Sequence, residues 1–288
     1  MNNVLSSIKN YFIIVLSFLL VLCGIELPFG LPRDAVTDAE NVRIMSFNIR
    51  YGEYDSRATI IPEVIADYKP DSVGIQECTF DWAITLGTLL DGYSFVGVGR
   101  DTGSMSADCG EMSAVLYRTD KYELVDHGTF WLSQTPNKVS FGWDAVCRRI
   151  CTWVILKNKE TGEQYAHVNT HLDHEGDEAR KNGTQMVVDF ALSFDMPTVV
   201  TGDFNYSKGC DYYNGIISSG LFDTQDLAPD TMNGKTYHGY NGGEEGTPID
   251  FIFVNNKVSQ VLKYRIMRTK YYGQYTSDHY PIYADMKL

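Results

Sequence analysis

The sequence predicts an α+β fold in which two packed β-sheets are flanked by helices within one domain. Three observations predict it. From Val42 onward, strand-like and helix-like patterns alternate to the end of the chain. Some neighbouring strands are joined by a short turn and others by a helix, so the sheets should contain both antiparallel and parallel pairs. No repeat, low-complexity tract or second linker divides residues 42–288.

The first half of this region predicts strands that alternate with helices. The segment Val42–Ile49 alternates with a period of two residues, as a strand does. The helix predicted at Ile61–Tyr68 has Pro62 in its first turn, where the missing N–H costs no hydrogen bond. The remaining elements of this half are a strand at Ser72–Gln76, a helix at Phe80–Leu90 and a strand at Met112–Tyr117.

The second half predicts more strands and one long helix. The turn residues Lys159–Glu163 predict a hairpin between two of the strands. The helix is predicted at Glu178–Phe194, because apolar residues at 186–187 recur at 190–191. The predicted strands are Tyr122–Trp131, Ile150–Leu156, Gln164–Asn169, Thr198–Thr201, Ile249–Val254, Val258–Met267 and Tyr280–Met286.

The chain before this domain contains a short apolar run, Tyr11–Cys23, that follows Lys9. A basic residue before a short apolar run is typical of a signal peptide, because a membrane-spanning helix needs about 20 apolar residues. The cleavage signal is poor, since Leu20 and Leu22 stand where small residues are expected. Cys23 is compatible with lipid attachment, and an uncleaved anchor is a further alternative.

We therefore divide the chain into three parts. Residues 1–25 are predicted to be a signal peptide or N-terminal membrane anchor, 26–41 a linker, and 42–288 the folded domain. This organisation predicts a domain outside the cytoplasm, either secreted or held at the cell surface.

The composition excludes several classes of protein. The 24 basic and 37 acidic side chains give a net charge of -13, which argues against coating nucleic acid through a broad basic surface. Hydrophobic residues make up 44%, so a disordered polar chain is excluded. The six cysteines include no CxxC pair, which makes a structural zinc site improbable. An enzyme that offsets its carboxylates with a metal cation remains open.

Polar side chains suited to metal and phosphate chemistry collect at the ends of the predicted strands. Each one alone has an ordinary structural interpretation, because Asp and Asn are common in turns and caps. They are Asn48 and Arg50 in SFNIR, Glu77 in GIQE, His171 in VNTHLDH, Asp203 and Asn205 in VVTGDFN, Asp250 in IDFIFV, and Asp278 and His279 in SDHYP.

As an ordered set these motifs are far more specific. From about Val42 to Leu288 the chain resembles the endonuclease/exonuclease/phosphatase superfamily, which includes deoxyribonucleases, apurinic endonucleases, deadenylases, sphingomyelinases and inositol polyphosphate phosphatases. The motifs SFNIR, QE, GDFN and SDHYP carry the resemblance. It implies a four-layer αββα sandwich, with two central mixed β-sheets between outer helices and the active site at one edge of the sheets.

The resemblance implies a divalent metal site for Mg²⁺ or Mn²⁺. Glu77 corresponds to the principal ligand, and Asn48 and Asp278 to additional ligands. Carboxylate and amide oxygens are the ligands that such hard cations favour. The cation would polarise a phosphoryl oxygen and offset the charge of the transition state.

The resemblance also implies the groups that act on the phosphate. Asp203 and Asn205 correspond to the pair that orients the attacking water and holds a phosphate oxygen. His171 and His279 correspond to the two histidines that bind the phosphate and transfer protons. Asp250 is expected to pair with His279.

Three further residues match the deoxyribonuclease branch. Glu111, in CGEMSAVLYR, corresponds to the acid that pairs with His171 there. Arg50 and Arg149 correspond to phosphate-binding arginines, since a guanidinium can hold a phosphate through two hydrogen bonds. For these three a surface ion pair is an equally open interpretation. The adjacent Asp173 and His174 are better explained as a polar loop.

The sequence lacks features of two other branches of the superfamily, and this limits the classes of substrate to be considered. Ser207 stands where inositol phosphatases have an arginine, and their tryptophan- and cysteine-containing motif before Asp250 is missing. A sphingomyelinase-like enzyme would need an exposed apolar hairpin, to which only Phe130, Trp131 and Leu132 could contribute.

We therefore predict an exported, divalent-metal-dependent hydrolase of phosphoester bonds, first of all a nuclease-like phosphodiesterase that uses an activated water. The alternatives are a phosphomonoesterase or a sphingomyelinase-like enzyme acting on a lipid or sugar phosphate. A non-catalytic surface binding protein ranks last, because the set of site residues is complete. The expected partners are a phosphoester substrate (nucleic acid, phospholipid or small phosphate ester) and, through the N-terminal segment, a membrane; we expect a monomer.

Overall fold

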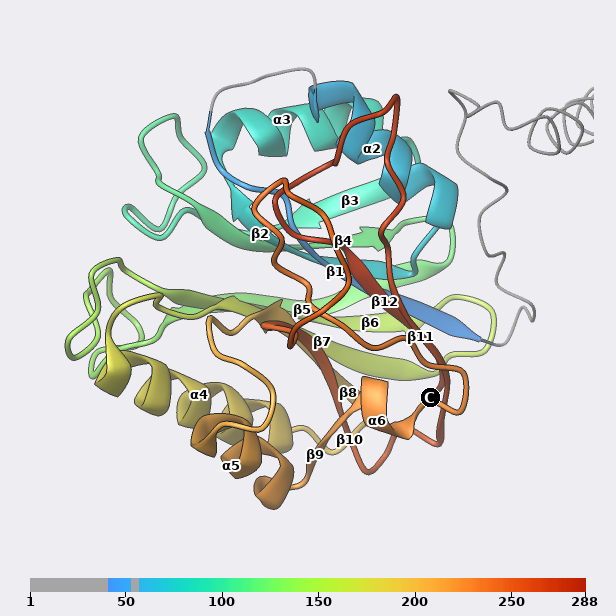
Figure 1. Cartoon of the computed structure of the whole chain (residues 1–288). Helices are drawn as coiled ribbons and strands as arrows, with labels where there is room; N and C mark the ends of the chain where they lie inside the picture. Colours follow the sequence, from blue (N-terminus) through green and yellow to red (C-terminus); the bar gives the residue numbers. More distant parts are fainter. Residues whose placement is uncertain (1–40, 53–56) are drawn as a thin grey trace, which may run out of the picture.

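The computed structural model describes residues 41–52 and 57–288, which form two six-stranded β-sheets packed between outer helices (Figure 1). The four-layer αββα sandwich is thereby confirmed. The predicted signal peptide or anchor at 1–25 lies outside the described residues, as does the linker apart from Asn41. In the described part of the chain, no helix has the length and apolar character needed to cross a bilayer.

The first sheet has the first strand of the domain near its centre. Strand β1 (Val42–Asn48) pairs in parallel with β2 (Ser72–Cys78) and antiparallel with β12 (Ile282–Lys287). The other strands are β3 (Tyr93–Val96), β4 (Met112–Arg118) and β11 (Gln260–Ile266), in the order β11-β12-β1-β2-β4-β3. The helices α2 (Arg57–Tyr68) and α3 (Phe80–Leu89) cover its outer face.

In the second sheet one pair of neighbouring strands is parallel and the other pairs are antiparallel. Its order is β5-β6-β7-β8-β10-β9, and β7 and β8 run parallel because helix α4 connects them. The strands are β5 (Tyr122–Trp131), β6 (Ile150–Asn158), β7 (Gln164–His171), β8 (Thr198–Asp203), β9 (Leu221–Asp223) and β10 (Asp250–Asn255). Its helices are α4 (Asp177–Leu192), α5 (Asp211–Ser219) and the short α6 (Thr224–Leu227).

The hydrophobic core has three layers that follow from the period of the strands. In β1, Ile44 packs in the layer between the sheets, whereas Met45 and Phe47 pack beneath α2 and α3. Successive side chains of a strand point to opposite faces, so a strand that is apolar at nearly every position is buried on both. The third layer lies between the second sheet and helices α4 and α5.

The layer between the sheets also contains polar side chains. His167 of β7 makes hydrogen bonds of 2.8 Å to Ser72 of the first sheet and of 2.8 Å to Thr201 of the second. Asn169 accepts a 2.7 Å hydrogen bond from Gln76 across the sheets. All five side chains are buried, and these bonds fix how the sheets dock.

The structure extends several predicted elements and adds others. Strands β7 and β8 run two residues past their predicted ends, to His171 and Asp203, because parallel pairing continues to that point. Helix α2 begins at Arg57, four residues before its predicted start. Among the described elements, those that the sequence patterns did not reveal are β3, α5, β9 and α6.

Candidate active site

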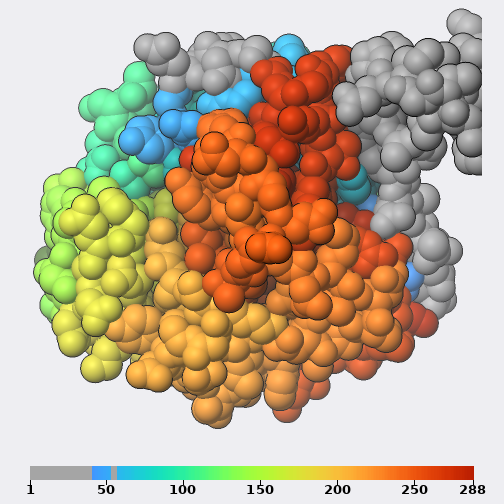
Figure 2. Space-filling view, viewed as in Figure 1, coloured from blue at the N-terminus to red at the C-terminus, as the bar shows by residue number. Residues whose placement is uncertain are grey.

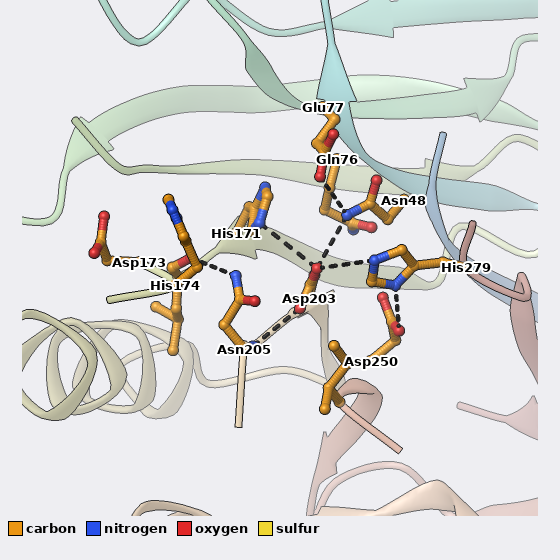
Figure 3. A network of polar contacts seen from close by, with 12 residues as sticks. Asn48, Gln76, Glu77, His171, Asp173, His174, Asp203, Asn205, Asp250 and His279 are labelled. Atoms are coloured by element: carbon orange, nitrogen blue, oxygen red, sulfur yellow. Dashed lines mark hydrogen bonds and ion pairs between the residues drawn. The ribbon is translucent and has the colours of Figure 1, made fainter. Parts of the chain in front are cut away.

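Most of the predicted site residues meet at one edge of the two sheets, and Figure 3 labels Asn48, Glu77, His171, Asp203, Asn205, Asp250 and His279 there. Asn48 and Glu77 lie at the carboxyl ends of β1 and β2 in the first sheet. In the second sheet, strand register places His171 opposite Asp203 and Asp250 opposite Asp203. Paired residues on neighbouring strands are about 5 Å apart, so chain order and register together bring these groups side by side.

A pocket of about 510 Å³ opens at this edge. Its lining contains eight of the predicted site residues: Glu77, Glu111, Arg149, His171, Asp203, Asn205, Asp278 and His279. The other six lining residues are Tyr51, Arg100, Cys147, His174, Tyr237 and Ile249. The predicted residues Asn48, Arg50 and Asp250 are not among the lining residues, and they contact those that are.

Two segments far apart in the sequence meet at this pocket. The segment before β10, orange in Figure 2, lies against the segment before β12. Tyr237 forms a β-bridge with His279, and the Tyr280 N–H donates to the Thr236 carbonyl at 2.8 Å. The segment before β10 therefore positions the motif SDHYP, although the sequence predicted no helix or strand in that segment.

Glu77 is turned toward the site by an irregular backbone. Its φ is +59°, and the pairing of β2 with β4 shifts register between Ile75 and Cys78. A non-glycine residue in this region is uncommon and is often found at functional sites. The Glu77 carboxylate accepts hydrogen bonds from Asn48 Nδ2 at 2.9 Å and from the Tyr51 N–H at 2.8 Å.

Asp203 lies at the centre of the polar network. Its Oδ2 accepts a 3.0 Å hydrogen bond from Asn48 Nδ2, and its Oδ1 a 2.9 Å bond from the Asn205 N–H. The Nε2 atoms of His171 and His279 lie 3.6 and 3.7 Å from Oδ2. Burial and the neighbouring Asp250 carboxylate raise the pKa of Asp203 to about 7, and His279 and the two asparagines oppose this shift.

His279 has the carboxylate partner that was predicted for it. Its Nδ1 lies 2.8 Å from Asp250 Oδ2, which leaves Nε2 on the side of Asp203 and the pocket. Burial alone lowers the pKa of His279, but the carboxylates of Asp250 and Asp203 outweigh it and raise this pKa to about 10. The imidazole is therefore a proton donor at neutral pH.

Glu111 forms an ion pair, one of the two interpretations that the sequence left open. Its carboxylate accepts two hydrogen bonds from Arg100, of 2.6 and 3.1 Å, and in the described part of the chain it makes none to His171. A half-buried carboxylate is better satisfied by a two-pronged guanidinium than by one imidazole nitrogen. Burial, followed by the charges of Arg149 and Arg100, holds the pKa of His171 well below its usual range.

Arg100 is a site residue that no sequence motif indicated, and the pairing of a loop brings it to the pocket. The Arg100 N–H donates to the Glu111 carbonyl at 3.0 Å, and the Asp101 N–H to the Cys109 carbonyl at 2.9 Å. The loop at 99–111 is hairpin-like, and its pairing places residue 100 opposite residue 111. To find Arg100 from the sequence, one would have to predict this pairing. The sequence pattern here, rich in Gly, Ser and Asp, gave no such indication.

The two predicted arginines occupy different environments. Arg50 stands at the exposed rim, 3.7 Å from Asp278 and stacked over the Tyr240 ring at 5.0 Å. Arg149 is buried; its Nε lies 3.4 Å from Asp173 and its Nη2 3.0 Å from His174 Nδ1. Asp173 and His174, which we interpreted as a polar loop, therefore also position Arg149 in the pocket wall.

The site has ligand atoms suited to a divalent metal. Ligand atoms of Glu77, His171 and Asp203 lie within 4.8 Å of one another. In residues 41–52 and 57–288, no lysine or arginine lies within ion-pair distance of Glu77, so a cation would offset its charge. Asn48 directs its Nδ2 to the carboxylates, and its Oδ1 accepts from the Arg50 N–H at 3.0 Å. Ligation by Asn48 or Asp278 stays a prediction.

Comparison with known proteins identifies the family. A sequence model of the Endonuclease/Exonuclease/phosphatase family matches residues 45–279. The chain belongs to this family. Its members hydrolyse phosphoester bonds, so the protein is a phosphoester hydrolase of the endonuclease/exonuclease/phosphatase family. The family is generally dependent on divalent metals, which agrees with the acidic and histidine groups of the site.

Solved structures with the same fold cover nearly the whole described domain. A family protein from Bacteroides vulgatus is 37% identical, with a TM-score of 0.79 over 86% of this chain and 99% of that one. A mannosyl-6-phosphatase from Bacteroides thetaiotaomicron is 32% identical, with a TM-score of 0.79 over 86% and 100%. Human nocturnin shares the fold at 20% identity and a TM-score of 0.66, over 85% of this chain and 93% of its own. No curated protein matches significantly in sequence.

Proposed function

We propose that this family member is an exported, divalent-metal-dependent phosphomonoesterase that acts on phosphorylated sugars. The observation that carries the proposal is the pocket, whose volume of about 510 Å³ lies in the range of small-ligand sites. The net charge of -13 also disfavours a long polyanionic strand. The likeness to a mannosyl-6-phosphatase over 86% of the chain supports a sugar phosphate. This proposal reverses the order of our two leading hypotheses.

The residues of the site suit the hydrolysis of such an ester. Asp203, whose pKa is raised by burial and by the Asp250 carboxylate, is placed to accept a proton from the attacking water. Asn205 holds it through its N–H, and its own Nδ2 is fixed by a 2.9 Å hydrogen bond to the Leu172 carbonyl. His279, held by Asp250, donates from Nε2 to the phosphate. A divalent cation bound near Glu77 would supply positive charge to the phosphoryl oxygens.

One observation favours a phosphodiester as the second candidate. Arg50 stands at the rim with 46% of its side chain exposed, where it would reach a second ester group outside the pocket. The sphingomyelinase-like alternative loses its structural support, because Trp131 and Leu132 are buried and cannot enter a bilayer. Trp131 instead donates a 2.8 Å hydrogen bond to the Arg100 carbonyl.

A substrate panel tests the proposal. The purified chain is assayed with mannose 6-phosphate, glucose 6-phosphate, p-nitrophenyl phosphate, bis(p-nitrophenyl) phosphate and plasmid DNA, each with Mg²⁺, Mn²⁺ or EDTA. We expect the monoesters to be hydrolysed, with the sugar phosphates preferred, and EDTA to abolish the activity. Faster hydrolysis of the diester or of DNA would replace the proposal by the phosphodiesterase. Activity that persists in EDTA would contradict the metal dependence.

Export is tested separately on the mature protein. Mass spectrometry of the N-terminus in the native cell would find cleavage after the apolar run, a lipid on Cys23, or the intact segment as an anchor. A full-length chain recovered only from the cytoplasm would contradict this part of the proposal.

A further inference from the structure

One wall of the pocket is built by side chains that the proposed chemistry does not use. Arg100, Glu111 and Arg149 line the pocket beside His171. The same three residues also line a small adjoining cavity of about 10 Å³. Arg100 and Glu111 are held rigidly by their paired hydrogen bonds, and each side chain is about 15% exposed. The wall therefore presents fixed polar groups to whatever part of the substrate lies beyond the phosphate.

The charges of this wall are balanced. Arg100 pairs with Glu111, and Arg149 with Asp173 at 3.4 Å. A nucleic-acid strand or a second phosphate would require cations that are not already neutralised. A neutral polyol has the opposite requirement, because each hydroxyl both donates and accepts a hydrogen bond. Alternating guanidinium and carboxylate groups satisfy both halves of that requirement.

The wall also retains donors that nothing in the described chain satisfies. Arg149 Nη1 and Arg100 Nε are buried and have no hydrogen-bond partner in residues 41–52 and 57–288. The Arg149 side chain is 6% exposed. A buried donor without a partner is costly, so such groups in a pocket wall commonly await a ligand or an ordered water.

We propose that Arg100, Glu111 and Arg149 form a hydroxyl-binding subsite that holds the sugar ring of the substrate. Glu111 accepts hydrogen bonds from ring hydroxyls while Arg100 fixes its orientation, and Arg149 donates to a neighbouring hydroxyl. The inference rests on the proposed function, and it names the residues that select the sugar. It gives Glu111 a role in specificity in place of the role behind His171 that the family resemblance implies.

The test compares two monoesters in one variant. For Glu111→Gln, kcat/KM is measured with mannose 6-phosphate and with p-nitrophenyl phosphate, which carries no hydroxyl for the subsite. Loss of a hydrogen bond to a charged group lowers binding by about ten- to a hundredfold, so the ratio of the two values should fall at least tenfold. The loss should appear mainly in KM for the sugar phosphate.

A neighbouring ion pair provides the matched control. Arg148 and Asp101 form an ion pair of 3.1 Å. Each is the sequence neighbour of a subsite arginine, yet neither is among the lining residues of the pocket. The substitution Asp101→Asn should leave the substrate ratio unchanged. If Glu111→Gln does not fold, Glu111→Asp keeps the charge beside Arg100 but withdraws the carboxylate, and its ratio should also fall.

The other outcomes overturn the inference and can be told apart. If Glu111→Gln lowers kcat equally for both substrates, Glu111 acts on the chemical step, as the resemblance implies, and not on the sugar. If the wild type prefers the sugar phosphate and the ratio does not change, only the subsite is wrong. If the wild type hydrolyses no monoester, the proposed function fails and the subsite with it.

Discussion

At the scale of single residues, the site depends on side chains whose backbone or partners are unusual. Glu77 adopts a left-handed conformation at a register shift, and Asn48 donates from one amide nitrogen to both Glu77 and Asp203. The same nitrogen thus links a carboxylate of the first sheet to one of the second. Two carboxylates so close to a single donor indicate a need for a cation at this point.

The substitution Glu77→Gln tests that need without relying on activity. A metal that binds only the folded protein stabilises it by about 2.7 kcal/mol at a hundredfold excess over its dissociation constant. Wild-type protein should therefore melt at a higher temperature in Mn²⁺ or Mg²⁺ than in EDTA. The variant should show little of this shift. An equal metal-induced shift in wild type and variant would remove Glu77 from the ligands.

The substitution Asp250→Asn tests how His279 is held. The variant keeps the shape of the side chain but loses the charge that faces Nδ1 at 2.8 Å. We expect kcat to fall by about a hundredfold with little change in KM, because a poorly oriented hydrogen-bond donor to the phosphate loses its effect mainly in the transition state. Steady-state kinetics with a preferred monoester measures both. A kcat within threefold of wild type would contradict the role of the pair.

At the scale of elements, a buried ion pair joins two strands of the first sheet and links them to helix α2. Arg43 of β1 makes 2.6 and 2.7 Å hydrogen bonds to Asp285 of β12, and its Nη1 donates to the Tyr68 carbonyl at the end of α2. Arg43 and Asp285 are register partners and are both buried. This pair joins two strands and a helix, and neither residue lines the active-site pocket.

The substitution Asp285→Asn should therefore affect stability and not catalysis. Removing one partner of a buried ion pair leaves the other charge uncompensated, at a cost of about 3 kcal/mol. Denaturant unfolding should show this loss, while kcat of the folded variant stays near that of wild type. Asp285→Asn and Asp250→Asn both remove the charge of a buried aspartate. The first is expected to lower stability, and the second kcat. A variant as stable as wild type would show that Arg43 finds full compensation elsewhere.

The sequence predicted elements better where their periodicity was strong. The long apolar strands and helix α4 were predicted within a few residues, because burial on one or both faces leaves a clear pattern. Strand β3 and helix α5 were missed. Both are short; α5 buries only Tyr213 and Ile216 fully, and in β3 only Val96 is fully buried. Tertiary contacts rather than local preference decide such elements.

The same limit applies to the site. Strand-end motifs were enough to name Glu77, Asp203 and His279, and the family resemblance supplied the partner of His279. The sequence left open whether Glu111 pairs with His171 or with a basic residue. The choice depends on how the loop at 99–111 closes, and loop closure leaves no periodic signal. The positions of Asp173 and His174 against Arg149 likewise depend on packing between distant segments.

At the scale of the whole molecule, the burial of His167 between the two sheets makes the stability of the fold depend on pH. It is fully buried between them, and burial lowers its pKa to about 3. In the unfolded chain a histidine has a pKa of about 6.5. Below pH 6.5 the unfolded chain therefore binds a proton that the folded protein excludes down to about pH 3. The stability from this group is complete above pH 6.5 and is lost as the pH falls through that window.

The variant His167→Asn isolates this contribution. Each pH unit costs about 1.4 kcal/mol, so wild type should lose about 2 kcal/mol more than the variant between pH 6.5 and pH 5. Urea unfolding at several pH values measures the two slopes, and their difference removes the other titrating groups. Parallel slopes would show that the histidine titrates alike in both states.

The hydrogen bond from Asn48 to Asp203 has a consequence for the protein as a catalyst. Because it joins the two sheets across their common edge, the geometry of the site depends on the depth and angle at which the sheets meet. A misplacement of about 1 Å can cost a hundredfold in rate. At Gly74, in the interface between the sheets, an added Cβ would collide with Thr201 and Asn169. A substitution there should therefore change the turnover rate, although Gly74 is not a site residue. The turnover rate of the enzyme therefore depends on how the two sheets are aligned.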